Sequence, residues 1–311
     1  MLLAMATGQR TRAPQRVEAA ALAAILAATI PSASSWASPT EPGRGTASAH
    51  VTGIVEVDER VERSVLRSRN APGVLVQVSA GSPGDGVGVT VHGINARCSD
   101  VGPLTLELAD RGAATLTFVY DDHYRRLRDS AADLAAALRP HLSARPREPL
   151  LVRAHSMGSR IVLVALERLG RESTLDGRDV EVALVAPPLG GYRSANLARV
   201  TPWPLSRIKN VRPAIDMGRY SRFQRRLQSL SLPEHVRVRV FFGTRDRVVD
   251  AADRRLWQVI ARTRARPVWL PGATHESAVG AAADWLRAER AGGGEPEVAP
   301  PVAARFAPSG R

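Results

Sequence analysis

Ser156 has the clearest chemical context in this chain, because small residues, Ala154 and Gly158, stand two positions away on either side. A short apolar run that begins at Leu150 precedes the serine and an apolar helical pattern follows it, which predicts a strand, a tight turn and a helix. Small neighbours allow the strand and the helix to pack closely while the hydroxyl stands clear of the sheet. The pattern therefore predicts a nucleophile elbow.

A carboxylate and an imidazole follow in an order that would activate such a serine. Asp246 comes after the predicted strand Val236–Phe242, and His275 lies in the loop after the short predicted strand Pro267–Leu270. Parallel sheets keep their functional side chains at the ends of strands. A serine hydroxyl needs a base to take its proton, and the base needs a group to orient it. Asp250, four residues further on, remains an alternative to Asp246.

Strands and helices must alternate along the chain to position these groups. Apolar residues recur at helical spacing from Leu127 to Leu138, and a closing helix is predicted after His275. The alternation predicts an α/β fold with a mostly parallel central sheet and helices on both faces. The other predicted strands are Val51–Val57, Gly73–Val78, Val87–Val91, Ala114–Tyr120 and Val180–Val185.

Four motifs between about Val87 and Leu286 resemble those of the α/β-hydrolase superfamily, in its lipase and esterase branch. The order of serine, aspartate and histidine is also that of the superfamily. The resemblance implies the α/β-hydrolase fold with a helical cap insertion. The motifs are Val91-His92-Gly93-Ile94, Ala154-His155-Ser156-Met157-Gly158, Val185-Ala186-Pro187-Pro188-Leu189-Gly190-Gly191, and Gly243-Thr244-Arg245-Asp246 followed by His275.

The same resemblance implies a catalytic triad of Ser156, His275 and Asp246. It also implies an oxyanion hole made by the backbone N–H groups of Ile94 and Met157. The expected reaction is hydrolysis of a small-molecule or lipid carboxylic ester through an acyl-enzyme, with no cofactor and no metal. Two alternatives stay open: a thioesterase or acyltransferase with the same triad, and a non-catalytic protein of this fold that binds anionic surfaces.

Several polar residues near these motifs need an explanation of their own. Arg153 stands where the family usually has an aliphatic residue, so it requires a carboxylate partner or an exposed strand end. We expect His92 to support the oxyanion loop by hydrogen bonding and His155 to have a structural place in the elbow. Asp121 and Asp122 are typical of helix-capping carboxylates.

Composition limits the other classes of function. The 311 residues are 44% hydrophobic and carry a net charge of +13, and the single cysteine, Cys98, excludes an intramolecular disulfide framework and a cysteine-rich metal site. No pattern resembles a helix-turn-helix or a zinc finger, so we expect no nucleic acid partner despite the charge. Nothing in the sequence identifies a protein partner.

The N-terminal residues 1–37 have the features of a signal peptide. Three arginines precede an apolar run from Ala19 to Ile30, and small residues lie around a cleavage site expected near Ala37. The run is shorter than the about 20 residues that span a bilayer. We therefore expect an exported protein with a linker at 38–50, an α/β-hydrolase domain at 51–290 and a disordered tail at 291–311.

The expected cap insertion, at about residues 187–234, is strongly basic. From Leu189 to Leu232 nine basic residues face one acidic residue, which gives this segment a charge of +8. Tyr220, Phe223, Leu227 and Leu230 follow one face of a predicted amphipathic helix. The cap could simply pack on the core, or it could engage an anionic lipid surface or an acidic substrate. The candidate contact residues are Trp203, Phe223, Arg222 and Arg226.

Overall fold

The computed structural model of the protein describes residues 62–65, 71–193, 195 and 210–292. All of them belong to one compact unit, Pro39–Arg311. The predicted signal peptide, the linker, the strand expected at Val51–Val57 and almost the whole of the predicted tail lie outside the described residues.

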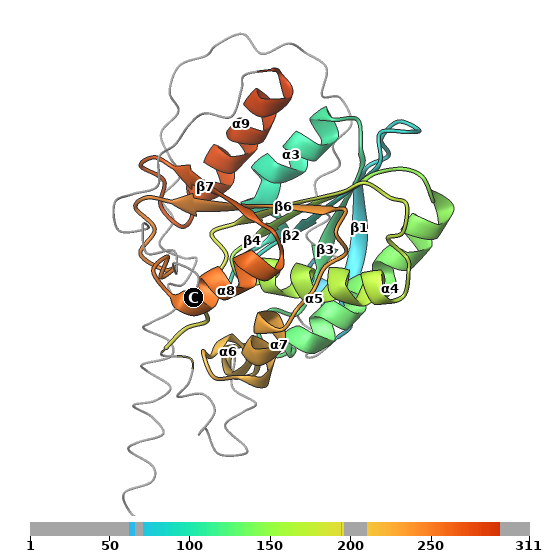
Figure 1. Cartoon of the computed structure of the whole chain (residues 1–311). Coiled ribbons are helices and arrows are strands. Elements are labelled where there is room, and N and C mark those ends of the chain that lie inside the picture. Colours follow the sequence, from blue (N-terminus) through green and yellow to red (C-terminus); the bar gives the residue numbers. More distant parts are fainter. Residues whose placement is uncertain (1–61, 66–70, 194, 196–209, 293–311) are drawn as a thin grey trace, which may run out of the picture. The chain divides into compact units, whose positions relative to one another are not determined.

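The described strands form one mixed sheet in the order β1-β3-β2-β4-β5-β6-β7 (Figure 1). β1 pairs with β3 in the antiparallel sense, and every other neighbouring pair is parallel. The parallel strands β2 to β5 are buried along their whole length, as expected for strands with helices on both faces. The bounds are β1 Val74–Ser79, β2 Val87–Val91, β3 Ala114–Val119, β4 Leu150–His155, β5 Val180–Val185, β6 Val236–Gly243 and β7 Arg266–Leu270.

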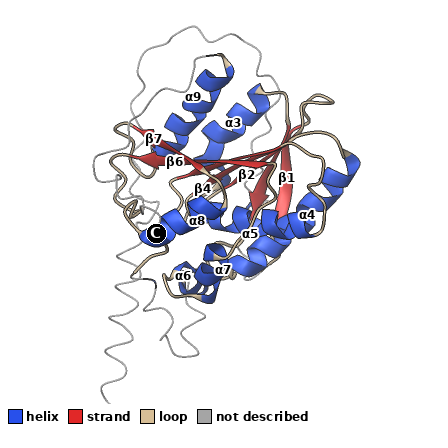
Figure 2. Cartoon of the chain, viewed as in Figure 1, coloured by secondary structure: helices blue, strands red, loops and turns tan. Residues whose placement is uncertain are grey.

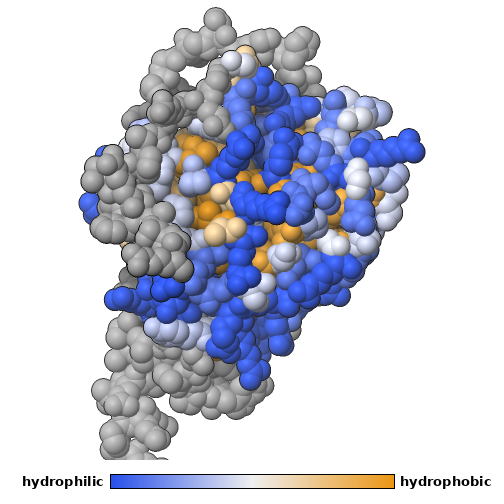
Figure 3. Space-filling view, viewed as in Figure 1, coloured by the Kyte–Doolittle hydropathy of each residue, from blue (hydrophilic) through white to orange (hydrophobic). Residues whose placement is uncertain are grey.

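Helices cover both faces of this sheet (Figure 2). One face carries α3 (Gly102–Asp110) and α9 (Ala278–Arg290), which pack against each other. The other face carries α4 (Leu127–Ala144), α5 (Met157–Arg171) and α8 (Arg254–Arg262) (Figure 1). Hydrophilic residues lie over the helices, and apolar residues show in the seam between the two helix layers (Figure 3). The predicted α/β architecture is confirmed.

The sequence missed two of these helices. The start of α3 reads Gly102-Pro103, which is typical of a turn, and α8 is only nine residues long. The helix predicted from Leu127 to Leu138 is confirmed, and the residues that define it are buried in α4.

The order of strands reverses at β2. The chain runs from β2 to β3 on one side and to β4 on the other, and α3 and α5 then lie on opposite faces of the sheet. In open parallel sheets, ligands bind where the order of strands reverses in this way. The loops after β2 and β4 carry Gly93 and Ser156, so both residues lie at that position.

Two short helices, α6 (Val211–Met217) and α7 (Arg222–Gln228), lie in the predicted cap insertion between β5 and β6. The side chain of Arg160, from α5, is completely buried beneath them. Its guanidinium donates to the carbonyl oxygens of Asp216 and Met217, both at 3.1 Å, and to Oε1 of Gln224 at 2.9 Å. Burial lowers the pKa of Arg160 to about 10, so the group stays charged at neutral pH. The Arg160 side chain therefore anchors α6 and α7 to α5.

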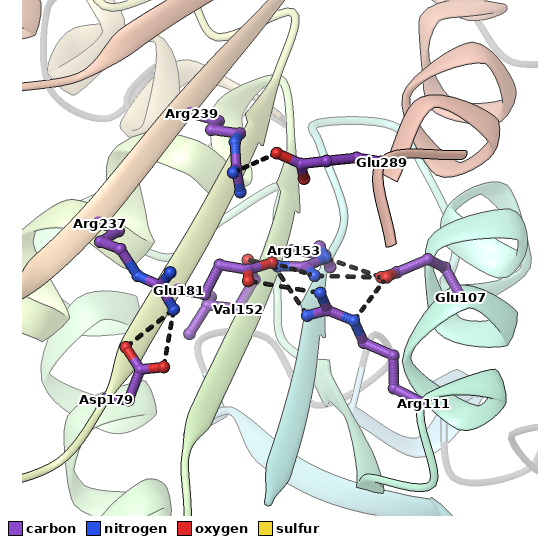
Figure 4. A network of polar contacts seen from close by, with 9 residues as sticks. All are labelled: Glu107, Arg111, Val152, Arg153, Asp179, Glu181, Arg237, Arg239 and Glu289. Atoms are coloured by element: carbon purple, nitrogen blue, oxygen red, sulfur yellow. Dashed lines mark hydrogen bonds and ion pairs between the residues drawn. The ribbon is translucent and has the colours of Figure 1, made fainter. Parts of the chain in front are cut away.

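A second buried cluster explains Arg153. This residue of β4 donates through Nε to Glu107 of α3 at 2.9 Å and through Nη2 to Glu181 of β5 at 2.6 Å (Figure 4). Arg111 bridges the same two carboxylates, at 3.1 Å to Glu107 and 3.0 Å to Glu181. Arg153 thus has the carboxylate partner that its place in the sequence requires, and it has two of them, Glu107 and Glu181. The four formal charges sum to zero within the cluster.

Candidate active site

Ser156 occupies a strained turn between β4 and α5. Its backbone has φ 51° and ψ −125°, a region that costs a residue with a side chain about 1–3 kcal/mol. The serine N–H donates to the carbonyl of Val185 at 2.9 Å, which holds the turn to the neighbouring strand. The position of Gly158 requires a glycine, because a Cβ there would overlap the carbonyl oxygen of His92. The geometry is that of the predicted elbow.

The structure brings His275 and Asp246 to this serine. Nε2 of His275 lies 3.0 Å from Oγ of Ser156, and Nδ1 lies 2.9 Å from Oδ2 of Asp246. A carboxylate can only accept, so Nδ1 carries the hydrogen and donates to Asp246. In the neutral ring Nε2 then accepts from the serine hydroxyl. Asp250 does not take this place, because it pairs with Arg219 at 3.0 Å.

Asp246 is held in its ionised form. Burial raises its pKa, but the hydrogen bond and charge of His275 and the backbone N–H groups of Val248 and Val249 outweigh burial. The net pKa of Asp246 lies below its usual value. The two N–H groups donate to Oδ1 at 2.7 and 3.1 Å, which leaves Oδ2 for the imidazole. The carboxylate can therefore stabilise a positive charge that forms on His275.

The loop after β2 lies directly against the nucleophile. A Cβ at Gly93 would come within 2.9 Å of Cβ and 3.5 Å of Oγ of Ser156, so this position accepts only glycine at its present distance. Among the hydrogen bonds of the described residues, none engages the backbone N–H of Ile94 or of Met157. Both N–H groups are left without an acceptor in the described structure, as the oxyanion hole expected from the sequence requires.

Buried side chains support this loop. His92 hydrogen bonds through Nδ1 to the carbonyl of Gly93 at 2.8 Å and stacks on Tyr120 with ring centroids 4.5 Å apart. Burial lowers the pKa of His92, which keeps the ring neutral. The Tyr120 hydroxyl donates to the carbonyl of His92 at 2.8 Å. The supporting place expected for His92 agrees with these contacts.

Asp121 and Asp122 serve differently from the prediction. The N-cap of α4 is Arg126, so neither aspartate caps that helix. Asp121 accepts from the N–H groups of His123 and Tyr124 and closes a turn. Asp122 accepts from the N–H of Asn95 at 2.5 Å and so fixes the end of the oxyanion loop. The capping interpretation is wrong because the chain makes a turn between β3 and α4.

Tyr192 is a residue of the site that sequence reasoning missed. Its buried phenol lies near Ser156, whose side chain lowers the pKa of the tyrosine. Burial and the charge of Asp246 raise the pKa of Tyr192, so its phenol stays protonated. The signal was nearby: Tyr192 directly follows the Gly190-Gly191 end of a motif already singled out.

A cavity of about 180 Å³ adjoins the Asp246 loop. Its charged wall is formed by Arg219, which contacts Asp250 and Asp253 at 3.0 and 2.7 Å. The other residues that line the cavity are mostly uncharged. They comprise Pro188, Gly190, Gly191, Tyr192, Arg193, Val248 and Val249.

The cap residues proposed from sequence lie in different environments. Trp203 is outside the described residues. Phe223 is only 5% exposed and packs against Arg160, with 5.4 Å between the guanidinium carbon and the ring centroid. The expectation that Phe223 contacts a substrate or a lipid surface is therefore corrected: its side chain packs inward. Arg222 is exposed, while Arg226 pairs with the buried Glu167 at 2.8 Å.

A metal ion or a membrane would require particular features in the described part of the chain. It contains no group of three or more histidine, cysteine, aspartate or glutamate residues placed to hold a metal ion. Within it, no helix combines the length and the hydropathy that crossing a bilayer requires. Cys98 is buried and unoxidised, and burial raises the pKa of its thiol well above its usual value.

Comparison with known proteins defines the fold. Neither a family sequence model nor a curated protein sequence matches this chain. Lipase B of Aspergillus fumigatus is similar in structure, with a TM-score of 0.52 and 16% identity over 81% of this chain and 63% of the lipase. Est1E from Butyrivibrio proteoclasticus, with bound ferulic acid, gives a TM-score of 0.50 and 14% identity over 71% of this chain and 94% of its own. The described domain has the α/β-hydrolase fold.

Proposed function

We propose that this protein is an exported serine hydrolase that cleaves carboxylic esters, as a carboxylesterase or lipase. One observation carries the proposal: Oγ of Ser156, the imidazole of His275 and the carboxylate of Asp246 form a continuous chain of hydrogen bonds of 3.0 and 2.9 Å. The chain ends at a serine on a strained elbow, where its hydroxyl can attack a substrate.

The geometry supports an acyl-enzyme mechanism. His275 takes the proton of Ser156 while Oγ attacks the ester carbonyl, and Asp246 stabilises the imidazolium that forms. The backbone N–H groups of Ile94 and Met157 receive the negative charge on the carbonyl oxygen. His275 then gives its proton to the departing alcohol oxygen as the carbon–oxygen bond breaks. Water, activated by the same histidine, hydrolyses the acyl-enzyme and restores Ser156.

Labelling with a fluorophosphonate probe tests the nucleophile. We expect the full chain to be labelled at one site and Ser156→Ala to lose both labelling and esterase activity, since the serine forms the covalent bond. Ser229→Ala, a change to an exposed hydroxyl on the cap, serves as the matched control and should keep both. An unlabelled wild-type protein would overturn the proposal in favour of a non-catalytic protein of this fold.

Substrate series would then separate the possible reactions. Hydrolysis of p-nitrophenyl esters of increasing chain length, with and without an interface, distinguishes a lipase from a carboxylesterase. Faster turnover of matched thioesters would favour a thioesterase. Transfer of the acyl group to an added alcohol, at the expense of hydrolysis, would favour an acyltransferase.

Export is tested by the mass of the protein recovered outside the producing cells. Cleavage near Ala37 would remove three arginines and one glutamate, which reduces the net charge from +13 to +11. A cell-associated protein with an intact N-terminus would contradict this part of the proposal.

A further inference from the structure

His155, next to the nucleophile, has contacts that the catalytic chain of hydrogen bonds does not use. It is the last residue of β4, and its side chain is buried between the elbow and the loop that carries His275. Its Nε2 lies 3.1 Å from the backbone carbonyl oxygen of His275. The two imidazole rings are in contact, with centroids 5.0 Å apart and planes at 49°.

The hydrogen bond fixes the form of His155. A carbonyl can only accept, so Nε2 carries a hydrogen and donates it. Burial, and next the charge of His275, lower the pKa of His155 to about 3, so the ring is neutral and Nδ1 has no hydrogen. Nδ1 is buried and has no hydrogen-bond partner among the described residues. The bond to His275 is thus the polar contact through which this ring acts in the described structure.

We propose that His155 is a positioning residue that holds the backbone of the catalytic base while Ser156 holds its ring. His155 and Ser156 are adjacent at the end of β4. Together they hydrogen bond to His275 at two points, its carbonyl oxygen and its Nε2. The proposal rests on the proposed function, since it gives His155 a task in that reaction. A neutral donor suits the task because it adds no charge beside the imidazolium that forms on His275.

The expected consequence is a loss of turnover when the donor is removed. The loop from Gly272 to Ser277 is otherwise tied by bonds on either side of His275, such as those made by Thr274. Without the hydrogen bond from His155 to the backbone carbonyl, the imidazole of His275 can move away from its position between Asp246 and Ser156. A misplacement of about 1 Å can cost roughly a hundredfold in rate.

Two variants of His155 separate hydrogen bonding from packing. His155→Phe keeps an aromatic ring beside His275 but has no donor, whereas His155→Gln keeps an N–H at nearly the position of Nε2 but has no ring. We expect kcat on a p-nitrophenyl ester to fall about 10- to 100-fold in the phenylalanine variant with KM little changed, and the glutamine variant to recover most of it. Thermal unfolding of both variants checks that each is folded.

The opposite ranking would overturn the proposal. If His155→Phe keeps wild-type kcat, or if His155→Gln is the slower variant, the ring serves packing alone. Crystal structures of both variants give a measure that needs no activity: the Nε2 to Oγ distance should stay near 3.0 Å in the glutamine variant and lengthen in the phenylalanine variant. An inactive and unlabelled wild type would refute the proposed function, while this distance would still decide the role of His155.

Discussion

Single residues set the geometry of this site within narrow limits. Ser156 is strained, Gly93 leaves no space for a side chain beside it, and Gly158 faces the carbonyl of His92. Gly93 lets the loop after β2 approach the side chain of Ser156, and Gly158 lets the start of α5 approach the backbone of that loop. The close approach brings the loop after β2 and Ser156 together, as the proposed oxyanion hole and nucleophile require.

Gly93→Ala is expected to reduce esterase activity with little loss of stability. The added methyl would lie 2.9 Å from Cβ of Ser156, so the oxyanion loop must move away and its donors are misplaced. We expect kcat to fall about 10- to 100-fold, less than the roughly 100- to 1000-fold lost when an oxyanion donor is removed altogether. Steady-state kinetics and a thermal melt measure the two effects.

Gly280→Ala is the matched control for that change. Gly280 lies in α9, and a Cβ there would meet no atom within 4 Å. We expect unchanged activity and a gain of about 0.5–1 kcal/mol in stability, because alanine is the better helix former. Equal activity of the two alanine variants would contradict the role given to Gly93.

Among the elements, α3, β4 and β5 are joined by charge as well as by apolar contacts. Arg153 on β4 is completely buried and meets Glu107 from α3 and Glu181 from β5. Burial by itself raises the pKa of Glu181. The charges and hydrogen bonds of Arg153 and Arg111 outweigh burial and lower the pKa to about 2. The folded state therefore holds this carboxylate in its ionised form much more firmly than water does.

Stability should depend on pH through Glu181. Its pKa is depressed on folding, so its contribution is complete above the usual carboxyl pKa of about 4.5 and is lost as the pH falls toward about 2. We expect Glu181→Gln to cost about 3–5 kcal/mol at neutral pH, since it leaves an arginine incompletely paired in the interior. Urea unfolding of wild type and variant, compared at neutral pH and at about pH 3, measures both effects.

The pair Glu234 and Arg264 offers a control for the same substitution. Both side chains are exposed, by 82% and 68%, and a surface pair of this kind contributes only about 0–1 kcal/mol. Glu234→Gln should therefore change stability little at any pH. A Glu181→Gln variant that behaves like Glu234→Gln would show that the buried cluster contributes nothing.

The sequence predicted elements better where a single pattern decided them. Val180–Val185 is a strand, apolar except for Glu181, with the bounds expected of it, and α4 follows its apolar spacing. The elbow was predictable because it is local in the chain. Tyr192 and Asp122 were not, because the first reaches Ser156 and the second reaches Asn95 only through the folded chain. Phe223 was left as a candidate contact for substrate or lipid because an amphipathic pattern does not say what covers its apolar face.

For the whole molecule, charge makes a separate prediction. The chain carries +13, and exposed arginines such as Arg222 lie on α7. We expect the full chain to bind vesicles that contain anionic lipid, and to be released as ionic strength rises from about 0.01 to about 1 M, where the screening length falls from about 30 to 3 Å. Sedimentation with vesicles measures this. Equal binding to neutral vesicles, or binding that salt does not weaken, would refute it.

The charge cluster around Arg153 also bears on how the chain reaches its native state. Its members come from positions 46 and 28 residues away from Arg153 in sequence, and each is acceptable in the interior only when the others have arrived. A partly folded chain that docks β4 without α3 or β5 would hold an uncompensated guanidinium among apolar side chains. Such partly folded states are high in free energy, so β4, β5 and α3 should fold and unfold together. The cluster thereby favours an all-or-none folding transition for the domain that carries Ser156.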